Sequence, residues 1–359
     1  MRGRFASARR RPTPALRLEP VVTLALVALA LVAPWPRLAV AGTKPAFDAR
    51  FDFLYIAANE GDGSAGHVAV AFGDRTYDFG RRDDGLLTLD RSASRDFRYR
   101  YAVRGNRAIR RLHVAVTAAT RELLLGAFEH RYDVQQRDLA ALKGARDAGD
   151  DGSARAIEDA YRYELLGRNC VSELFGTVDD ALASAPDGVM AASTRLLGGH
   201  IAPGGLTSLP RVAAAAVRRT WRVVAADEIP SYRRYRVGVL ERGRPWVALR
   251  ESNVLTSSIY RRSEHDSIFL FFTDGAVAAR PLLGAVNGVA GLLVTAAGLA
   301  VAPVDRGALL VGGVRGVVYS LPELAFVNIR KGTFPDATPD DAAALVGAED
   351  CEGTVSPPG

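Results

Sequence analysis

Two residues capable of covalent catalysis lie far apart in this sequence, a histidine at position 67 and a cysteine at position 170. The chain of 359 residues has only five histidines and two cysteines, so both residue types are sparse. A cysteine thiolate attacks carbonyl carbons, and an imidazole takes up its proton near neutral pH. One histidine and one cysteine are therefore the minimum for thiol catalysis, if the fold brings them together.

The histidine lies at the start of GHVAVAFGDRTYDFG, residues 66–80, which predicts a β-hairpin. With a two-residue Gly-Asp turn at 73–74, Ala69 pairs with Asp78. His67 and Asp78 then share one face as diagonal neighbours, close enough for the carboxylate to fix the imidazole tautomer and stabilise its protonated form. A three-residue turn would separate them, and a surface His beside a surface Asp is the alternative reading.

The cysteine lies in LGRNCVSELFGTVDDAL, whose apolar residues fall at helical spacing. Asn169 is a good N-cap, which places Cys170 in the first turn. There the helix dipole favours a thiolate, and the free backbone N–H groups could bind an oxyanion. A buried inert cysteine or a disulfide to Cys351 are the alternatives, although Cys351 lies in a polar tail without a packing signal.

The glycine-rich stretch GDGSAG (61–66) matches G-x-G-x-x-G, but a dinucleotide site requires a helix next. The alternating run HVAVAF follows instead, so we expect a loop beside a cleft and no cofactor. The other four histidines match no motif, and without an H-E-x-x-H or a second cysteine near Cys170 we expect no metal site.

The charge distribution argues against nucleic acid. Residues 1–41 contain seven arginines and one glutamate, so the formal charge of +6 lies there and the remaining chain is near neutral. That part has no basic excess to neutralise phosphates. Residues 1–41 themselves resemble a signal peptide, with an apolar run at 21–35 and Ala-Val-Ala before Gly42. An uncleaved anchor is the alternative, and in either case the body of the protein lies outside the cytoplasm.

Local patterns predict several elements. We expect a strand at 51–57 and a helix at 118–146, which the segment 147–155 ends. A second helical stretch leads through YRYELLGRNC. In residues 186–280 we expect a helix near VAAAAVRRTW and strands near YRVGVLE and SIFLFF, while RESNVLTSSIY has no assigned role. The tail beyond the hydrophobic region, rich in Pro, Asp and Gly, predicts disorder.

Residues 281–304 carry no charge and are long enough to cross a bilayer, but they are rich in glycine. A second apolar stretch follows and contains Arg315 and Glu323, which disfavour spanning. Three interpretations are open: a membrane-spanning helix, an interfacial helix pair and a buried hairpin. We favour the first two, in which the region contacts the membrane, over the third.

The order of these features resembles the circularly permuted papain-like proteins. The features that carry the resemblance are GHVAV, the following TYDFG, a long helical insert and Y-x-Y-x-x-L-x-x-NC at a helix start. It covers residues 50–182 and is closest to the periplasmic domain of Lnb-type lipoprotein N-acyltransferases. The NlpC/P60 peptidases and lecithin–retinol acyltransferases are more distant.

The resemblance implies Cys170 as nucleophile, His67 as base and Asp78 as the third polar member, with Asn59 or Glu60 as its substitutes. Tyr163 and Asn169 are the expected substrate contacts; Tyr163 could equally be a core residue.

Together with the local patterns, the resemblance predicts an α+β fold, with a signal peptide at 1–41 and a permuted papain-like domain at 45–185. A mixed α/β extension follows at 186–280, then a hydrophobic helical region at 281–333 and a disordered tail at 334–359.

The expected function is an exported, membrane-associated thiol acyltransferase or acyl hydrolase of the periplasm or cell envelope. Cys170 would take an acyl group from a phospholipid as a thioester and pass it to a lipoprotein amine or to water. An NlpC/P60-like cell-wall amidase or peptidase, and a non-catalytic envelope interaction module, are the alternatives.

Overall fold

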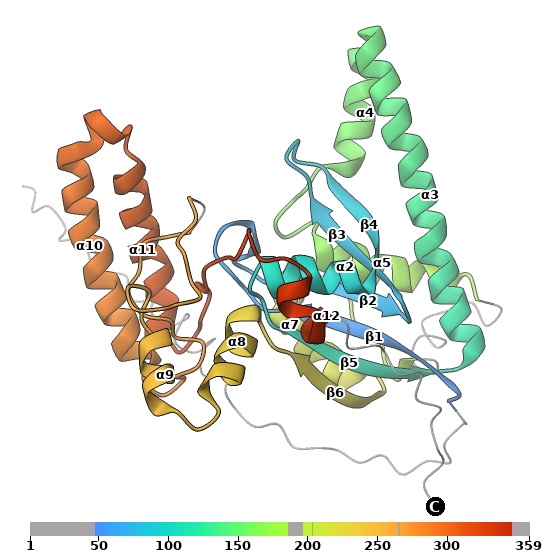
Figure 1. Ribbon diagram of the computed structural model, residues 1–359. Helices are drawn as coiled ribbons and strands as arrows, with labels where there is room; N and C mark the ends of the chain where they lie inside the picture. The colour runs from blue at the N-terminus through green and yellow to red at the C-terminus, as the bar shows by residue number, and fades with distance from the viewer. Residues whose placement is uncertain (1–46, 186–196, 203, 265, 347–359) are drawn as a thin grey trace, which may run out of the picture. The chain divides into compact units, whose positions relative to one another are not determined.

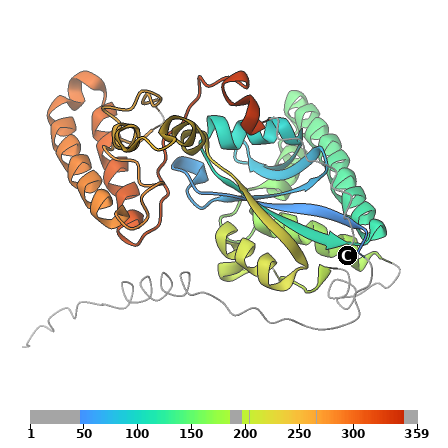
Figure 2. The same cartoon turned by 60° about the horizontal axis from the view of Figure 1, so that its bottom comes forward.

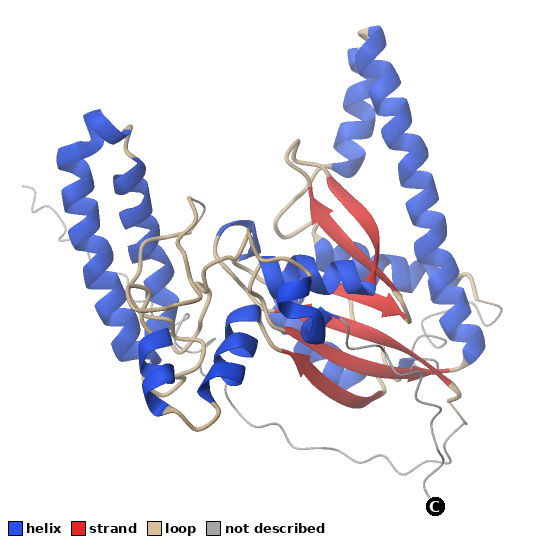
Figure 3. Cartoon of the chain, viewed as in Figure 1, coloured by secondary structure: helices blue, strands red, loops and turns tan. Residues whose placement is uncertain are grey.

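The structure is a computed structural model that describes residues 47–346 except 186–196, 203 and 265. The described residues form a mixed α/β fold built on one antiparallel sheet, which agrees with the predicted α+β class at that level (Figures 1 and 3). The predicted signal peptide and Cys351 lie outside the described residues.

The sheet has six strands in the order β4-β3-β2-β1-β5-β6, and every neighbouring pair is antiparallel. The strands are β1 (Ala49–Ile56), β2 (His67–Phe72), β3 (Arg75–Arg81), β4 (Leu87–Ala93), β5 (Ile109–Val116) and β6 (Val223–Ile229).

The β2–β3 hairpin has the predicted register. Phe72 pairs with Arg75 and Ala69 with Asp78, so the turn has two residues, 73 and 74. Gly73 has a φ of +71°, the left-handed conformation that such turns need and that glycine adopts without a steric cost.

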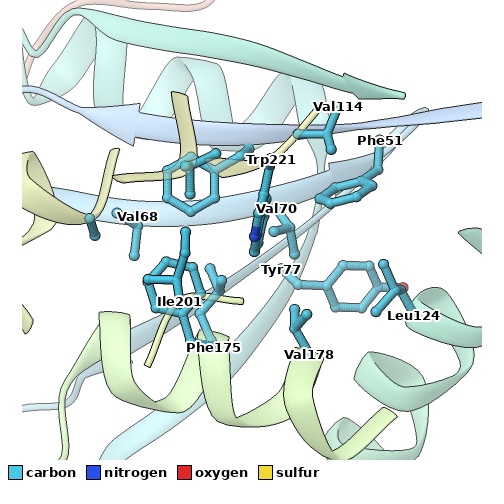
Figure 4. Packing of buried hydrophobic residues seen from close by; sticks show 14 of the residues in the cluster. Phe51, Val68, Val70, Tyr77, Val114, Leu124, Phe175, Val178, Ile201 and Trp221 are labelled. Atoms are coloured by element: carbon cyan, nitrogen blue, oxygen red, sulfur yellow. The ribbon is translucent and has the colours of Figure 1, made fainter. Parts of the chain in front are cut away.

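Helices cover both faces of the sheet, because apolar side chains of its strands point alternately to one face and to the other. Val68 and Val70 of β2 lie in one core with residues of α3 (Ala118–Ala148), α5 (Cys170–Ala183) and α7 (Pro210–Thr220) (Figure 4). Ala69 and Ala71 lie in a second core on the other face. The elements of that core include α2 (Ser94–Arg98), the π-helix η2 (Tyr99–Arg104), α8 (Tyr232–Glu241) and α12 (Ala343–Val346).

The helical insert differs in part from its prediction. The predicted helix is α3, which begins after a Thr117 cap and ends at Gly149 with a φ of +69°. The next helix, α4 (Asp151–Tyr161), begins inside the segment that we expected to be a break, because Asp150 caps it by accepting a hydrogen bond from the Ser153 amide. Only the first residue of YRYELLGRNC, Tyr161, belongs to α4, and residues 162–169 are not helical.

The extension at 186–280 is not separate from the rest of the fold. Strand β6 pairs with β5, and Trp221, which follows α7, packs edge-on against Phe51, Phe53 and Phe175 of the first core. The described residues accordingly belong to one compact unit. The remaining short helices are η1 (Gly61–Gly63), η3 (Gly205–Ser208), α9 (Pro245–Glu251) and η4 (Asp340–Ala342).

Both strands predicted in the extension are wrong. YRVGVLE lies in α8. SIFLFF lies outside the named strands, because three of its amides bond to a helical hairpin and only an isolated bridge joins Phe271 to Asn253. The Leu270 and Phe271 amides donate to Asn287 Oδ1, and the Ile268 amide donates to the Gly312 carbonyl. RESNVLTSSIY folds around the buried Glu251 carboxylate, which accepts hydrogen bonds from Ser257 and Ser258.

The chain returns from its C-terminal part to the sheet through residues 330–333, which we call the strap. Its Lys331 amide donates to Asn59 Oδ1 (3.0 Å), and Asn59 Nδ2 donates to the Gly332 carbonyl (3.1 Å). Asn106 Nδ2 donates to the Lys331 carbonyl (2.7 Å). The strap thereby fixes the loop between β1 and β2.

The first part of the predicted disordered tail is ordered. Residues 335–346 include η4 and α12, and Ala342, Leu345 and Val346 are buried in the second core. These three apolar side chains outweigh the polar composition on which the prediction rested. Residues 347–359 lie outside the described residues.

Two antiparallel helices, α10 (Arg280–Asp305) and α11 (Ala308–Leu324), form a hairpin in the predicted hydrophobic region (Figure 2). Glycines let their backbones approach: a Cβ at Gly291 would lie 2.8 Å from the Val317 nitrogen. Glu323 is fully buried at this hairpin, where Arg330 Nη2 donates to it (2.8 Å).

The outer surface of the hairpin is apolar. Exposed side chains from both helices include Leu282, Val289, Leu292, Leu293, Leu299, Val304, Val311, Val318 and Leu321. Within the described part of the chain, α10 is the one helix long and apolar enough to cross a membrane.

Candidate active site

Helix α5 begins at Cys170 as its sequence predicts. Asn169 adopts an extended conformation, and its Oδ1 accepts hydrogen bonds from the Val171 and Ser172 amides (2.9 and 3.1 Å). Ser172 Oγ accepts a hydrogen bond from the Asn169 amide, which completes a capping box. The Cys170 thiol is free, half-buried and in the first helical turn.

The Asn169 side chain is engaged in holding the start of α5. Besides accepting the two helix amides, its side chain donates from Nδ2 to the Leu165 carbonyl (2.7 Å) and the Ser208 carbonyl (3.3 Å). The amide group is therefore fully engaged in holding the start of α5, and the expected substrate contact is not supported.

His67 and Asp78 meet as predicted from the hairpin. His67 Nε2 lies 2.9 Å from Asp78 Oδ2, and both side chains are buried. Gly66, which precedes the histidine, has a φ of +88°, and a Cβ there would lie 3.2 Å from the Ile56 carbonyl oxygen. The positive φ and the close approach to β1 both favour glycine at this position. Gly66 therefore sets the start of β2, and with it the position of His67.

Cys170 reaches the same imidazole. Burial alone would lower the pKa of His67, but the charge of Cys170 and the hydrogen bonds to Asp78 and to Cys170 raise that pKa to about 9. His67 is accordingly an imidazolium at neutral pH. Since Asp78 occupies Nε2, the other ring nitrogen, Nδ1, is left to exchange a proton with the sulfur.

Tyr101 completes the group, and sequence reasoning missed it. Its ring stacks on His67 with centroids 5.3 Å apart, and its hydroxyl donates to Asp78 Oδ2 (2.8 Å). Burial and the nearby Asp78 charge raise the pKa of Tyr101 well above its usual value, so the hydroxyl stays protonated as a donor. The aromatic and arginine-rich stretch FRYRYAVRGNR was the available signal, but its π-helix is not readable from spacing.

The other sequence candidates lie elsewhere. Asn59 is engaged by the strap, and Glu60 Oε1 accepts the Ser267 amide (2.9 Å), so neither substitutes for Asp78. Tyr163 packs beside the first core with the Arg81 guanidinium over its ring, which favours the core reading. The strand β2, not a helix, follows the glycine-rich loop, as expected.

No group of three or more His, Cys, Asp and Glu side chains among the described residues is placed to hold a metal ion. A cavity of about 700 Å³ lies between α3, α4 and α5. It is lined by residues that include Phe79, Leu123, Arg131 and Glu173, and its lining does not include Cys170, His67 or Asp78.

Comparison with protein-family models, with curated proteins and with solved structures gives no match to this chain. Chemical interpretation therefore rests on the geometry. A thiol at a helix N-terminus, a buried imidazolium and a carboxylate that orients it can carry out nucleophilic substitution at an acyl carbon.

Proposed function

We propose that this protein is an exported thiol enzyme that takes acyl groups from membrane phospholipids through a thioester on Cys170. The observation that carries the chemistry is the contact of Cys170, at the start of α5, with the His67–Asp78 pair. The order of histidine strand and cysteine helix also supports the proposed resemblance to permuted papain-like proteins.

The reaction follows from the positions of the protons. The Cys170 sulfur attacks an ester carbonyl and forms a C–S bond, while the proton originally on the thiol resides on His67. The tetrahedral intermediate collapses by breaking the ester C–O bond, and His67 donates that proton to the departing alcohol oxygen. Backbone N–H groups in the first turn of α5 are available to the oxyanion.

The thioester is then resolved by an amine or by water. His67, now neutral, accepts the proton of the attacking nucleophile, and the C–S bond breaks to regenerate the thiolate. An amine yields an amide, as expected for N-acylation of a lipoprotein, and water yields a free fatty acid.

The α10–α11 hairpin supports a lipid substrate. Leucine and valine side chains cover its outer surface, and the chain after residue 41 has a formal charge near zero. Charge attraction therefore contributes little to membrane binding, and insertion of apolar surface is the available driving force. A soluble cell-wall amidase would have no use for such a surface.

Mass spectrometry of the full chain after incubation with phospholipid tests the proposal. We expect a mass increase of one acyl group on Cys170 and none in Cys170→Ser. Cleavage of muropeptides without an acyl adduct would instead identify an amidase. An unmodified, unreactive thiol under both conditions would identify a non-catalytic module.

A further inference from the structure

Arg107 is a buried cation beside the candidate active site. It follows Asn106, whose φ is +49°. Arg107 is buried, with only 8% of the residue exposed. Its Nε donates to the Ala57 carbonyl (2.7 Å), and its amide donates to the Tyr101 carbonyl (2.9 Å). The guanidinium is thus fixed beneath the loop that leads to His67, where a Cβ at Gly63 would lie 3.0 Å from Nη1.

This guanidinium has no carboxylate within ion-pair distance among the described residues. Its Nη2 is buried without a hydrogen-bond partner, and Arg107 forms no ion pair with a described carboxylate. A second buried basic group, the Lys331 amine of the strap, donates to the Ala58 carbonyl and forms no ion pair with a described carboxylate. Burying a cation without an ion-pair partner is costly, so the buried Arg107 guanidinium with its unpartnered Nη2 indicates that an anion completes the site.

Ring contacts place Arg107 in the same group as His67. Burial lowers the pKa of Arg107, and the charges of Tyr101, Tyr55, Cys170 and Asp78 oppose that change. Burial and the Arg107 charge lower the pKa of Lys331 to about 7. The guanidinium also lies 5.3 Å from the centre of the Tyr101 ring, the ring that stacks on His67.

We propose that Arg107 binds an oxyanion group of the substrate, a phosphate or a carboxylate, and holds it beside Cys170. A guanidinium fork matches the oxygens of either group. The proposal rests on the proposed function for its substrate class, and there it assigns Arg107 to the phosphate diester of a phospholipid. In such a lipid the phosphate is only a few covalent bonds from the ester carbonyls, so an anion site next to the nucleophile suits it.

Alkylation of Cys170 measures this site without any catalytic turnover. In the full chain, the rate constant for the anionic reagent iodoacetate is divided by that for neutral iodoacetamide. Arg107→Gln should lower this ratio by about tenfold or more, the range of a charge-assisted hydrogen bond. Arg107→Lys should retain part of it, because charge remains but the fork is lost.

Arg100→Gln is the matched control. Arg100 lies on the π-helix η2, which precedes Arg107, and it pairs with Asp90. The charges that act on Arg100 are those of Asp78, Asp90 and Tyr101, so its substitution removes one charge at the edge of the same group. Its ratio should stay at the wild-type value. An unchanged ratio in Arg107→Gln, or an equal fall in Arg100→Gln, would overturn the proposal.

Competing anions test the anion site in the wild-type chain. This measurement does not depend on whether Arg107→Gln folds. Glycerol 3-phosphate should slow iodoacetate alkylation more than acetate does if the ligand is a phosphate, and the reverse order indicates a carboxylate. Protection by neither anion contradicts an anion site. If wild-type protein forms no acyl adduct yet shows this protection, the proposed function fails while the anion site stands.

Discussion

His67 and Asp78 share a hydrogen bond but contribute unequally to the proposed reaction. His67→Ala removes the proton acceptor, so formation of the acyl adduct should fall by about 10²–10⁴-fold. Asp78→Asn keeps an oxygen that can accept from both His67 Nε2 and the Tyr101 hydroxyl, and Tyr101 still stacks on the ring. We expect only about a tenfold loss from the missing charge, equivalent to about one pKa unit.

The measurement is the rate of adduct formation followed by mass spectrometry. Equal losses in His67→Ala and Asp78→Asn would show that the carboxylate is as essential as the imidazole, and would contradict this ranking.

The raised pKa of His67 makes stability depend on pH in a defined window. Folding raises this pKa from about 6.5 to about 9, so protonated His67 stabilises the folded state. The contribution is fully present below pH 6.5 and is lost as the pH rises through about 9. Its upper limit is about 3 kcal/mol.

Urea unfolding of wild-type protein and His67→Gln between pH 5 and 10 measures this contribution. The difference in unfolding free energy should be largest at the acidic end and shrink above pH 8. A difference that grows with pH would show that His67 is neutral in the folded protein.

The candidate catalytic group illustrates which residues a sequence can predict. His67 and Asp78 are joined by a two-residue turn, so strand alternation was enough to place them together. Tyr101 reaches Asp78 from a π-helix, and Arg107 lies beyond it, so neither position follows from a regular period.

At the scale of elements, the start of α5 is the feature that holds the thiol. Asn169→Ala would lose the cap to two helix amides and both Nδ2 bonds, so we expect a destabilisation of about 1–2 kcal/mol. Asn169→Asp retains the cap oxygens and should lose less. Urea unfolding compares the two, and an effect of Asn169→Ala no larger than that of Asn169→Asp would contradict the capping role.

Elements with local signals were predicted, and elements that depend on distant partners were not. Helix α3 and the β2–β3 hairpin carry their caps and turns in the sequence. SIFLFF is as apolar as a strand, but the Asn287 side chain of α10 accepts hydrogen bonds from the Leu270 and Phe271 amides. Nothing within that stretch indicates such a partner.

At the scale of the whole molecule, the hairpin surface should bind the protein to membranes. Leu293→Asp combined with Leu299→Asp places two charges on the exposed apolar face. If that face enters lipid, each aspartate costs roughly 2.5–3.5 kcal/mol of insertion free energy. The double variant should move from the pellet to the supernatant when it is sedimented with phospholipid vesicles.

Leu255→Asp is the control, because Leu255 is 78% exposed but lies outside the hairpin. If the double variant stays with the vesicles, or if the control is released equally, the hairpin is not the membrane-binding surface. Point substitutions are preferable to deletion beyond Arg280, which would also remove the strap and α12 from the folded unit.

Contacts cross the predicted boundaries at residues 185 and 280, and the segments that make them are far apart in the chain. Strand β6 extends the sheet at β5, and α12 packs into the second core, so segments on both sides of each boundary share one interior. Sequence separation alone concealed these pairings.

The strap has a consequence for biogenesis. Asn59 bonds to Gly332, 273 positions later in the chain, so the loop before His67 is held by a segment that the ribosome makes long afterwards. A nascent chain already containing His67 and Cys170 still lacks the residues that hold this loop. The reactive thiol would therefore mature late, after synthesis has passed the strap, and a chain in transit would be spared premature acylation.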